Sequence, residues 1–241
     1  MSPLKILLLI TVALQAVFSP LFLKYMWPRK NKWSLLYKML CSLLFVATGF
    51  LAVNIADNHT RFAQMVIIGL LCGFVGDFFL GLNGKANFVI GTLFFLTNHI
   101  LYCYAYTVTR NQLFPETNNV RTNVLEVVGA FVLLGIFVFV VKRLKFSLRG
   151  AASLLLLYGV VLSYMLVKSV TFGFSLLTAG APGYEIGAGL LLSGAALYFA
   201  SDMTLGMILL GSVRHYPLKC FNNLTYIIGQ VCIALTILYI K

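Results

Sequence analysis

The segment MVIIGLLCGFVGDFFLGL, residues 65–82, has a single charged side chain, Asp77, among eighteen residues. A stretch this long and this apolar matches the length that an α-helix needs to cross the hydrocarbon core of a bilayer. The segment therefore predicts a membrane-spanning helix. It also places a carboxyl group where water is scarce, and the free-energy cost of that placement makes Asp77 the first candidate functional residue.

Apolar runs of the same kind recur along the chain of 241 residues, which is 61% hydrophobic and only 10% charged. A soluble domain of this size cannot bury so much apolar surface. We therefore expect an all-α integral membrane protein in which residues 1–241 form a single transmembrane domain. The eight predicted spans are residues 4–24, 34–54, 62–83, 87–108, 124–142, 150–172, 184–209 and 219–240.

The N-terminal run has some features of a secretory signal peptide. It is too long for one, has no clear small-x-small cleavage site and is followed by further spans. We therefore expect it to be the first helix of the membrane domain and to be retained.

The net charge of +12 comes from Lys and Arg residues in short loops between the apolar runs. Such residues set the orientation of a membrane protein, so the charge does not indicate a nucleic-acid partner. Twelve of the 18 lie at the odd-numbered loops and six on the opposite side. We predict cytoplasmic odd-numbered loops and external termini, in the cell membrane of a bacterium or the endoplasmic reticulum of a eukaryote. Asn58-His59-Thr60 is a glycosylation sequon, on the external side in that orientation.

A short motif occurs twice, at residues 77–81 and 202–206, and both copies read Asp-x-x-Leu-Gly near the end of a span. The two spans are four helices apart, so they run in the same direction through the membrane. A 4+4 tandem repeat predicts this pattern, and coincidence explains it equally well.

Asp202 is the second acid inside a predicted span. An aspartate in mid-helix costs about 2.5–3.5 kcal/mol on membrane-insertion scales. At ~1.5 Å per residue, Asp77 and Asp202 both lie about 10 Å from the same end of their spans, and nearby glycines favour close helix packing. We therefore expect the two acids to face each other and to be catalytic, although each could simply cap a polar cluster or pair with a buried base. The other acids are predicted in loops or near span ends: Asp57, Glu116, Glu126 and Glu185.

Other polar residues at compatible depths are candidates for binding substrate or water. They are His99 and Tyr102 in the fourth span, Tyr198 in the seventh, and Asn222, Tyr226 and Gln230 in the eighth. The last three are spaced i, i+4 and i+8, so their shared face must contact protein or water and not lipid. Structural hydrogen bonding is the simpler role for the Tyr and Gln residues, whereas for His99 both roles fit the sequence equally.

Two carboxyl groups close together in a dry site share one proton, which leaves one acid and one anion at neutral pH. Glycosidases use such a pair to pass through a transition state that resembles an oxocarbenium ion. The sequence has no Ser/His/Asp signature, no HExxH zinc motif and no phosphate-binding glycine loop. No such motif therefore competes with acid–base chemistry by the two acids.

The residues around both acids resemble the YhhN-like lysoplasmalogenase family. The resemblance rests on Gly76, Asp77, Gly91, Phe95, His99 and Tyr102 in the first half, and on Tyr198, Ser201, Asp202, Thr225, Tyr226 and Gln230 in the second. It implies eight spans and hydrolysis of the vinyl ether of a lysophospholipid within the bilayer, without a metal or an organic cofactor. The implied products are a fatty aldehyde and glycerophosphoethanolamine or glycerophosphocholine. The proposed catalytic acids of the family correspond to Asp77 and Asp202, and the sequence leaves open which of them is the acid.

Vinyl-ether hydrolysis begins with proton transfer to the β-carbon and leaves an oxocarbenium ion, which agrees with the chemistry expected of the two acids. We expect Lys85 and Arg214 to contact the phosphate at the cytoplasmic mouth of the site. The chain departs from the family after the second acid, where Ile208 and Leu209 replace an Asn and a basic residue that are common there. Its headgroup contacts therefore need not be those of the family.

Two other functions remain open at this point. A proton-coupled transporter of a small molecule or lipid also uses intramembrane carboxylates and internal repeats, although no proline interrupts residues 62–83 or 184–209. In a lipid-binding or scaffold protein, the acids would only hold helices together. The sequence does not indicate an oligomeric state.

Overall fold

The computed structural model describes residues 2–27, 31–117, 119–143, 152–211 and 215–241, with side chains described except at residues 140–143, 152–155 and 209–211. These residues form α-helices and one short 3-10 helix, η1. The elements are α1 (Pro3–Tyr25), α2 (Lys32–Ala56), α3 (Arg61–Gly81), α4 (Lys85–Leu113), η1 (Pro115–Thr117), α5 (Val120–Arg143), α6 (Ala152–Ala179), α7 (Tyr184–Gly211) and α8 (Tyr216–Thr236). All eight α-helices are long and apolar enough to cross a membrane, which confirms the predicted all-α, multi-pass architecture.

Some helices extend beyond the predicted spans. Helix α4 continues five residues past the predicted end, to Leu113, and α6 continues seven residues, to Ala179. Hydropathy ends the fourth span before Arg110, but this arginine is buried and forms an ion pair with Glu126 of α5. Because the charge is neutralised inside the protein, the helix does not have to end where the apolar run ends.

Side chains mark the start of two helices and close one loop. Asn31 and Ser34 form a capping box at the start of α2, and the Thr60 side chain caps α3. Asn58 is fully buried, and its amide nitrogen donates to the carbonyl oxygens of Ile237 (2.8 Å) and Ile240 (2.7 Å). The sequon asparagine therefore ties the α2–α3 loop to the end of the chain, and glycosylation would have to break both bonds.

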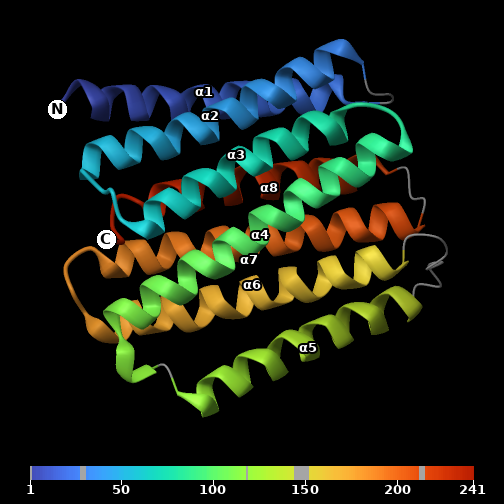
Figure 1. Ribbon diagram of the computed structural model, residues 1–241. Helices are drawn as coiled ribbons and strands as arrows, with labels where there is room; N and C mark the ends of the chain where they lie inside the picture. The colour runs from blue at the N-terminus through green and yellow to red at the C-terminus, as the bar shows by residue number, and fades with distance from the viewer. Residues whose placement is uncertain (1, 28–30, 118, 144–151, 212–214) are drawn as a thin grey trace.

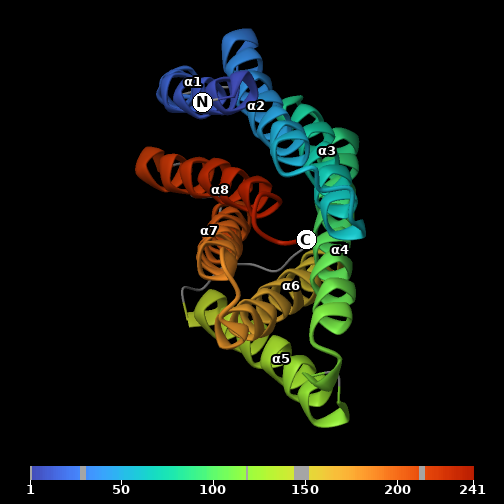
Figure 2. The ribbon, with the colours of Figure 1, turned by 90° about the vertical axis from the view of Figure 1, so that its left-hand side faces the viewer.

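The helices form an antiparallel bundle. Helices α1, α3, α5 and α7 all end at one end of the bundle, and the start of α1 and the C-terminus lie at the other (Figure 1). Viewed along the helices, α1 to α4 form a curved wall, α8 and α7 stand beside it, and α6 closes the gap between α7 and α4 (Figure 2). Helix α5 is the outermost and packs mainly on α6.

The two halves of the chain pack in related ways. Within each half, consecutive helices are neighbours, and α2 contacts α8 in the same way that α6 contacts α4. Each of these pairs joins the second helix of one half to the fourth helix of the other. A 4+4 repeat predicts this arrangement, and the duplication itself stays a prediction.

Candidate active site

Asp77 of α3 and Asp202 of α7 line one cavity of about 210 Å³. Asp77 is 1% exposed and Asp202 is 7% exposed. Asp77 lies four residues before the end of α3, whereas Asp202 lies nine residues before the end of α7, because α7 continues for more than two turns past its acid. The equal spacing from the helix ends that the sequence predicted is therefore not observed, although both acids reach the same cavity.

Asp77 is surrounded by hydrogen-bond donors. The Lys38 ammonium lies 2.8 Å from Oδ1. The Ser42 hydroxyl donates to Oδ2 at 2.5 Å, and the Tyr226 hydroxyl donates to the same oxygen at 2.9 Å. Because a carboxylate accepts hydrogen bonds at both oxygens and a cation adds a favourable charge interaction, this setting suits the ionised form of Asp77.

Asp202 has a different environment without a positive side chain of lysine or arginine among its described contacts. The Tyr158 hydroxyl donates to Oδ2, and Nε2 of His99 lies 3.0 Å from the same oxygen. Nδ1 of His99 is buried without a described hydrogen-bond partner, which favours a neutral imidazole that donates from Nε2. Both donors contact Oδ2. If Asp202 carried a proton on Oδ1, it would be a neutral acid, and its carbonyl oxygen, Oδ2, would accept two hydrogen bonds.

The helices that supply these partners are related in the two halves of the chain. Asp77 on α3 is contacted from α2 and from α8, and Asp202 on α7 is contacted from α6 and from α4. Each acid thus receives one set of partners from the preceding helix and another from the fourth helix of the opposite half. The chemistry differs, however, because one acid meets a lysine and the other meets a histidine and a tyrosine.

Three of the predicted polar residues form a layer behind the cavity. Tyr102 donates to Oε1 of Gln230 at 2.8 Å, and Tyr198 donates to Oδ1 of Asn98 at 3.0 Å. Neither tyrosine lines the cavity, and nor does Gln230. Their bonds join α4 to α8 and α4 to α7.

Other predicted residues divide between the cavity and its surroundings. Tyr226 and Asn222 line the cavity, and the Asn222 amide donates to the Ser201 backbone at 2.7 Å. His99 does not line the cavity, but its Nε2 lies 2.9 Å from the Tyr158 hydroxyl and 3.0 Å from Oδ2 of Asp202, and both of these residues line it. Lys85 is exposed at the start of α4 and does not line the cavity. Arg214 lies outside the described residues.

The cavity has a polar end whose lysines are not the basic residues that the sequence predicted there. Lys38 and Lys219 are the cations among its described lining residues, and Lys219 also lies over the Trp27 ring at 5.4 Å. Ile208 lines the cavity as well, whereas the side chain of Leu209 lies outside the described residues. The polar and charged lining residues are Ser34, Lys38, Asp77, Tyr158, Ser201, Asp202, Lys219, Asn222, Asn223 and Tyr226.

Sequence reasoning missed Lys38, Ser42 and Tyr158 as partners of the two acids. From the sequence, Lys38 is one of the twelve basic residues assigned to the odd-numbered loops, but α2 begins at Lys32, so Lys38 lies nearly two turns inside the helix. The spacing of Lys38 and Ser42, i and i+4 on one face, was the available signal. Tyr158 gave none, because an isolated tyrosine is common in membrane spans.

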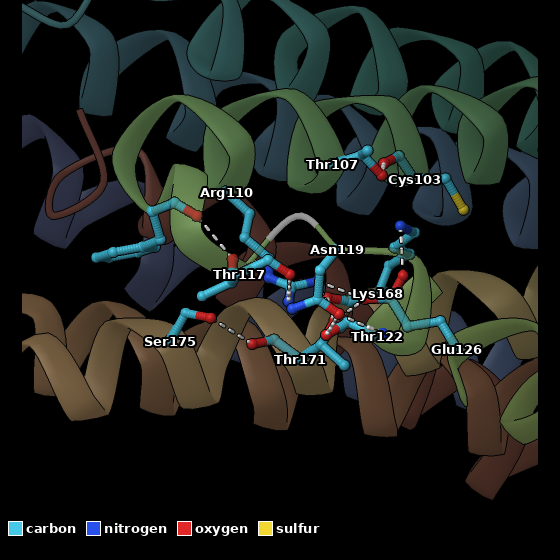
Figure 3. A network of polar contacts seen from close by, with 11 residues as sticks. Cys103, Thr107, Arg110, Thr117, Asn119, Thr122, Glu126, Lys168, Thr171 and Ser175 are labelled. Atoms are coloured by element: carbon cyan, nitrogen blue, oxygen red, sulfur yellow. Dashed lines mark hydrogen bonds and ion pairs between the residues drawn. The ribbon is translucent and has the colours of Figure 1, made fainter. Parts of the chain in front are cut away.

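A second buried charge cluster lies toward the opposite end of the bundle (Figure 3). Glu126 of α5 is 1% exposed. Its Oε1 accepts hydrogen bonds from Arg110 of α4 at 2.5 Å and from Thr171 of α6 at 2.7 Å. Its Oε2 lies 2.6 Å from Nζ of Lys168. The sequence placed Glu126 near a span end and counted Arg110 and Lys168 as charges of the external loops. All three are in fact buried, since each neutralises another.

Comparisons with known proteins give a consistent result. The model of the YhhN family matches residues 33–237. A protein of Dictyostelium discoideum described as a lysoplasmalogenase homolog is 26% identical over 208 residues, which is 76% of this chain and 66% of that protein. The chain thus matches just under two thirds of the length of this relative. No solved structure matches the chain significantly.

Proposed function

The chain belongs to the YhhN family, and from this premise we propose that it is a membrane hydrolase of lysoplasmalogens. The reaction would cleave the vinyl ether and release a fatty aldehyde and glycerophosphoethanolamine or glycerophosphocholine. The observation that carries the proposal is the shared cavity of Asp77 and Asp202, in which Asp77 pairs with Lys38 and Asp202 contacts Tyr158 and His99 among the described residues. The name of the relative in Dictyostelium discoideum supports the same substrate class.

We assign the role of general acid to Asp202. Its Oδ2 already accepts from Tyr158 and His99, so the proton to be transferred would sit on Oδ1. Transfer of that proton to the β-carbon of the vinyl ether would form a C–H bond and leave an oxocarbenium ion, with Asp202 as the anion. The two donors on Oδ2 would then stabilise the charge that develops on Asp202.

We assign the role of ionised partner to Asp77. Its carboxylate would stabilise the oxocarbenium ion and orient a water molecule toward the carbon that is bonded to oxygen. When water adds, its surplus proton would return to Asp202. The hemiacetal then collapses, with its hydroxyl proton moving to the glycerol oxygen, so the net reaction consumes one water molecule and restores both carboxyl groups.

The polar end of the cavity fits a phosphodiester headgroup. Lys38 and Lys219 supply positive charge there, with amides from Asn222 and Asn223. Ammonium groups bind phosphate as point charges. These two lysines replace Lys85 in our proposal, because Lys85 does not line the cavity. In the predicted orientation, this end faces the cytoplasm.

A labelling experiment tests the reaction. Purified protein is given a lysoplasmalogen in D₂O, and the released aldehyde is analysed by mass spectrometry. Proton transfer to the β-carbon predicts one deuterium at C2 of the aldehyde for each turnover. Release of a fatty acid, or movement of intact lipid across a proteoliposome without aldehyde release, would contradict the proposal, and the second result would favour a transporter.

A further inference from the structure

A second, smaller cavity of about 50 Å³ adjoins the one that holds both acids. The two cavities share Leu80, Phe88, Phe95, Tyr158, Asp202 and Leu205 as lining residues. Asp202 therefore stands at the boundary between them, whereas Asp77 lines only the larger one. The smaller cavity extends from this boundary toward the peripheral helix α5, which contributes Phe137.

The two cavities differ in chemical character. Every lysine and asparagine that lines either of them belongs to the larger cavity. Beyond the shared residues, the smaller cavity is lined by Thr92, Phe137, Gly159, Met203 and Gly206. The Thr92 hydroxyl donates to the Phe88 carbonyl, so it is already satisfied. The smaller cavity is thus an apolar compartment that begins at a carboxyl group.

Glycines keep this compartment open. A Cβ at Gly206 would lie 3.1 Å from Cζ of Phe137, and a Cβ at Gly159 would lie 2.9 Å from Cδ1 of Leu134. Phe137 and Leu134 both belong to α5, so α5 forms the outer wall. The Glu126 ion pairs hold this helix to α4 and α6, which fixes the position of the wall.

We propose that the smaller cavity binds the first carbons of the alkenyl chain, next to the bond that is cleaved. This inference rests on the proposed function and adds a chain subsite to it. In a lysoplasmalogen, the vinyl ether joins a polar glycerophospho group to an apolar chain. The border at Asp202 has the same order of polar and apolar groups, so it places the β-carbon, which is the second carbon of the chain, beside the proposed acid.

The volume suits a short segment of chain. At roughly 15 Å³ for each water-sized group, a cavity of about 50 Å³ holds about three such groups. The remainder of the chain would pass over α5, whose Val132 and Ile136 are exposed on the surface expected to face lipid. The subsite therefore recognises the start of the chain and leaves its total length unrestricted.

Substitution of Gly206 tests the subsite without requiring catalysis. Binding of a radiolabelled saturated analogue, 1-O-hexadecyl glycerophosphocholine, is measured on purified protein. Gly206→Val should weaken binding about tenfold, the change expected when two methylene groups lose their burial. Gly189→Val is the matched control, because Gly189 lies on the same helix and a Cβ there would meet no neighbouring atom within 4 Å. This control should bind as the unmodified protein does.

A compensating variant distinguishes loss of the subsite from a folding defect. Combining Gly206→Val with Phe137→Ala removes the ring that the new side chain would meet, so binding should recover. A photo-crosslinker on the chain carbons next to the ether should label α5 near Phe137 or α7 at residues 203–206.

Labelling confined to α1, α2 or α8, or equal binding by the Gly206→Val and Gly189→Val proteins, would overturn the subsite. If the subsite results hold but no aldehyde is released, the hydrolase assignment fails and the chain subsite stands as part of a lipid-binding site. If aldehyde is released and Gly206→Val has no effect, only the subsite fails.

Discussion

The Lys38 ammonium lies 2.8 Å from Oδ1 of Asp77, inside a cavity that a second aspartate also lines. This ion pair gives the two acids different electrostatic environments. A carboxylate next to a cation is stabilised in its charged form, while Asp202 is bonded to a tyrosine and a histidine. The difference allows one cavity to hold an anion and a proton donor together, which is the requirement of the proposed reaction.

Replacing either acid by its amide should strongly reduce turnover. Asp202→Asn keeps the shape of the side chain but removes the transferable proton, so kcat should fall about 100-fold or more. Asp77→Asn should cause a loss of similar order, because the amide carries no charge to stabilise the cation. Aldehyde release by purified protein measures both. Asp57→Asn is the control, since Asp57 is an exposed acid at the end of α2. Full activity in either amide variant would refute the role assigned to that acid.

Removing Lys38 should damage both stability and activity. Lys38→Met leaves the Asp77 carboxylate buried without its cation, and breaking a buried ion pair from one side costs about 3–5 kcal/mol; the partial exposure of Lys38 places the expected loss at the lower end of this range. Adding Asp77→Asn to Lys38→Met should restore the unfolding temperature in detergent without restoring activity. The matched control is Lys85→Met, at an exposed lysine. If Lys38→Met has the same unfolding temperature as this control, the ion pair does not stabilise the fold.

The hydroxyl of Tyr158 should support catalysis through Asp202. Tyr158→Phe keeps the ring and removes one of the two donors to Oδ2, so the anion left after proton transfer loses a hydrogen bond worth about 1.5–3 kcal/mol. We expect kcat to fall at least about tenfold with little change in KM. Tyr104→Phe, at an exposed tyrosine on α4, serves as the control. A change confined to KM would instead place the hydroxyl in substrate binding.

Glu126 should stabilise the attachment of α5. Glu126→Gln leaves Arg110 and Lys168 buried without an anion, so the free energy of unfolding should fall by about 3–5 kcal/mol. Limited proteolysis should then cleave near α5 sooner than elsewhere, because the other contacts of this helix are mainly with α6. Glu116→Gln, an exposed glutamate in η1, is the control. Equal melting and proteolysis of the two variants would show that the cluster does not anchor α5.

Much of the fold followed from the sequence, because the thickness of the bilayer imposes a length on every apolar run. The eight spans, their order and two of the buried acids, Asp77 and Asp202, could be predicted in this way, whereas the burial of Glu126 could not. The predicted ends were less accurate where a charge is buried, as at Arg110. A charged residue near the end of an apolar run is predicted to lie in a loop. Its burial becomes possible only when a residue of opposite charge on another helix pairs with it.

The hydrogen-bond and ion-pair partners of the two acids also could not be predicted from the sequence. Lys38 and Ser42 reach Asp77 because α2 packs on α3 with one particular face, and Tyr158 reaches Asp202 because α6 packs on α7. Helix faces inside a membrane are selected by close packing and by hydrogen bonds between helices, since lipid gives apolar faces little preference for one another. The sequence by itself determined a multi-pass membrane protein with two costly interior carboxyl groups. Only the tertiary structure decided that these groups share one cavity, that Lys38 pairs with Asp77 and that an apolar compartment begins at Asp202, because each of these facts depends on which helix faces meet.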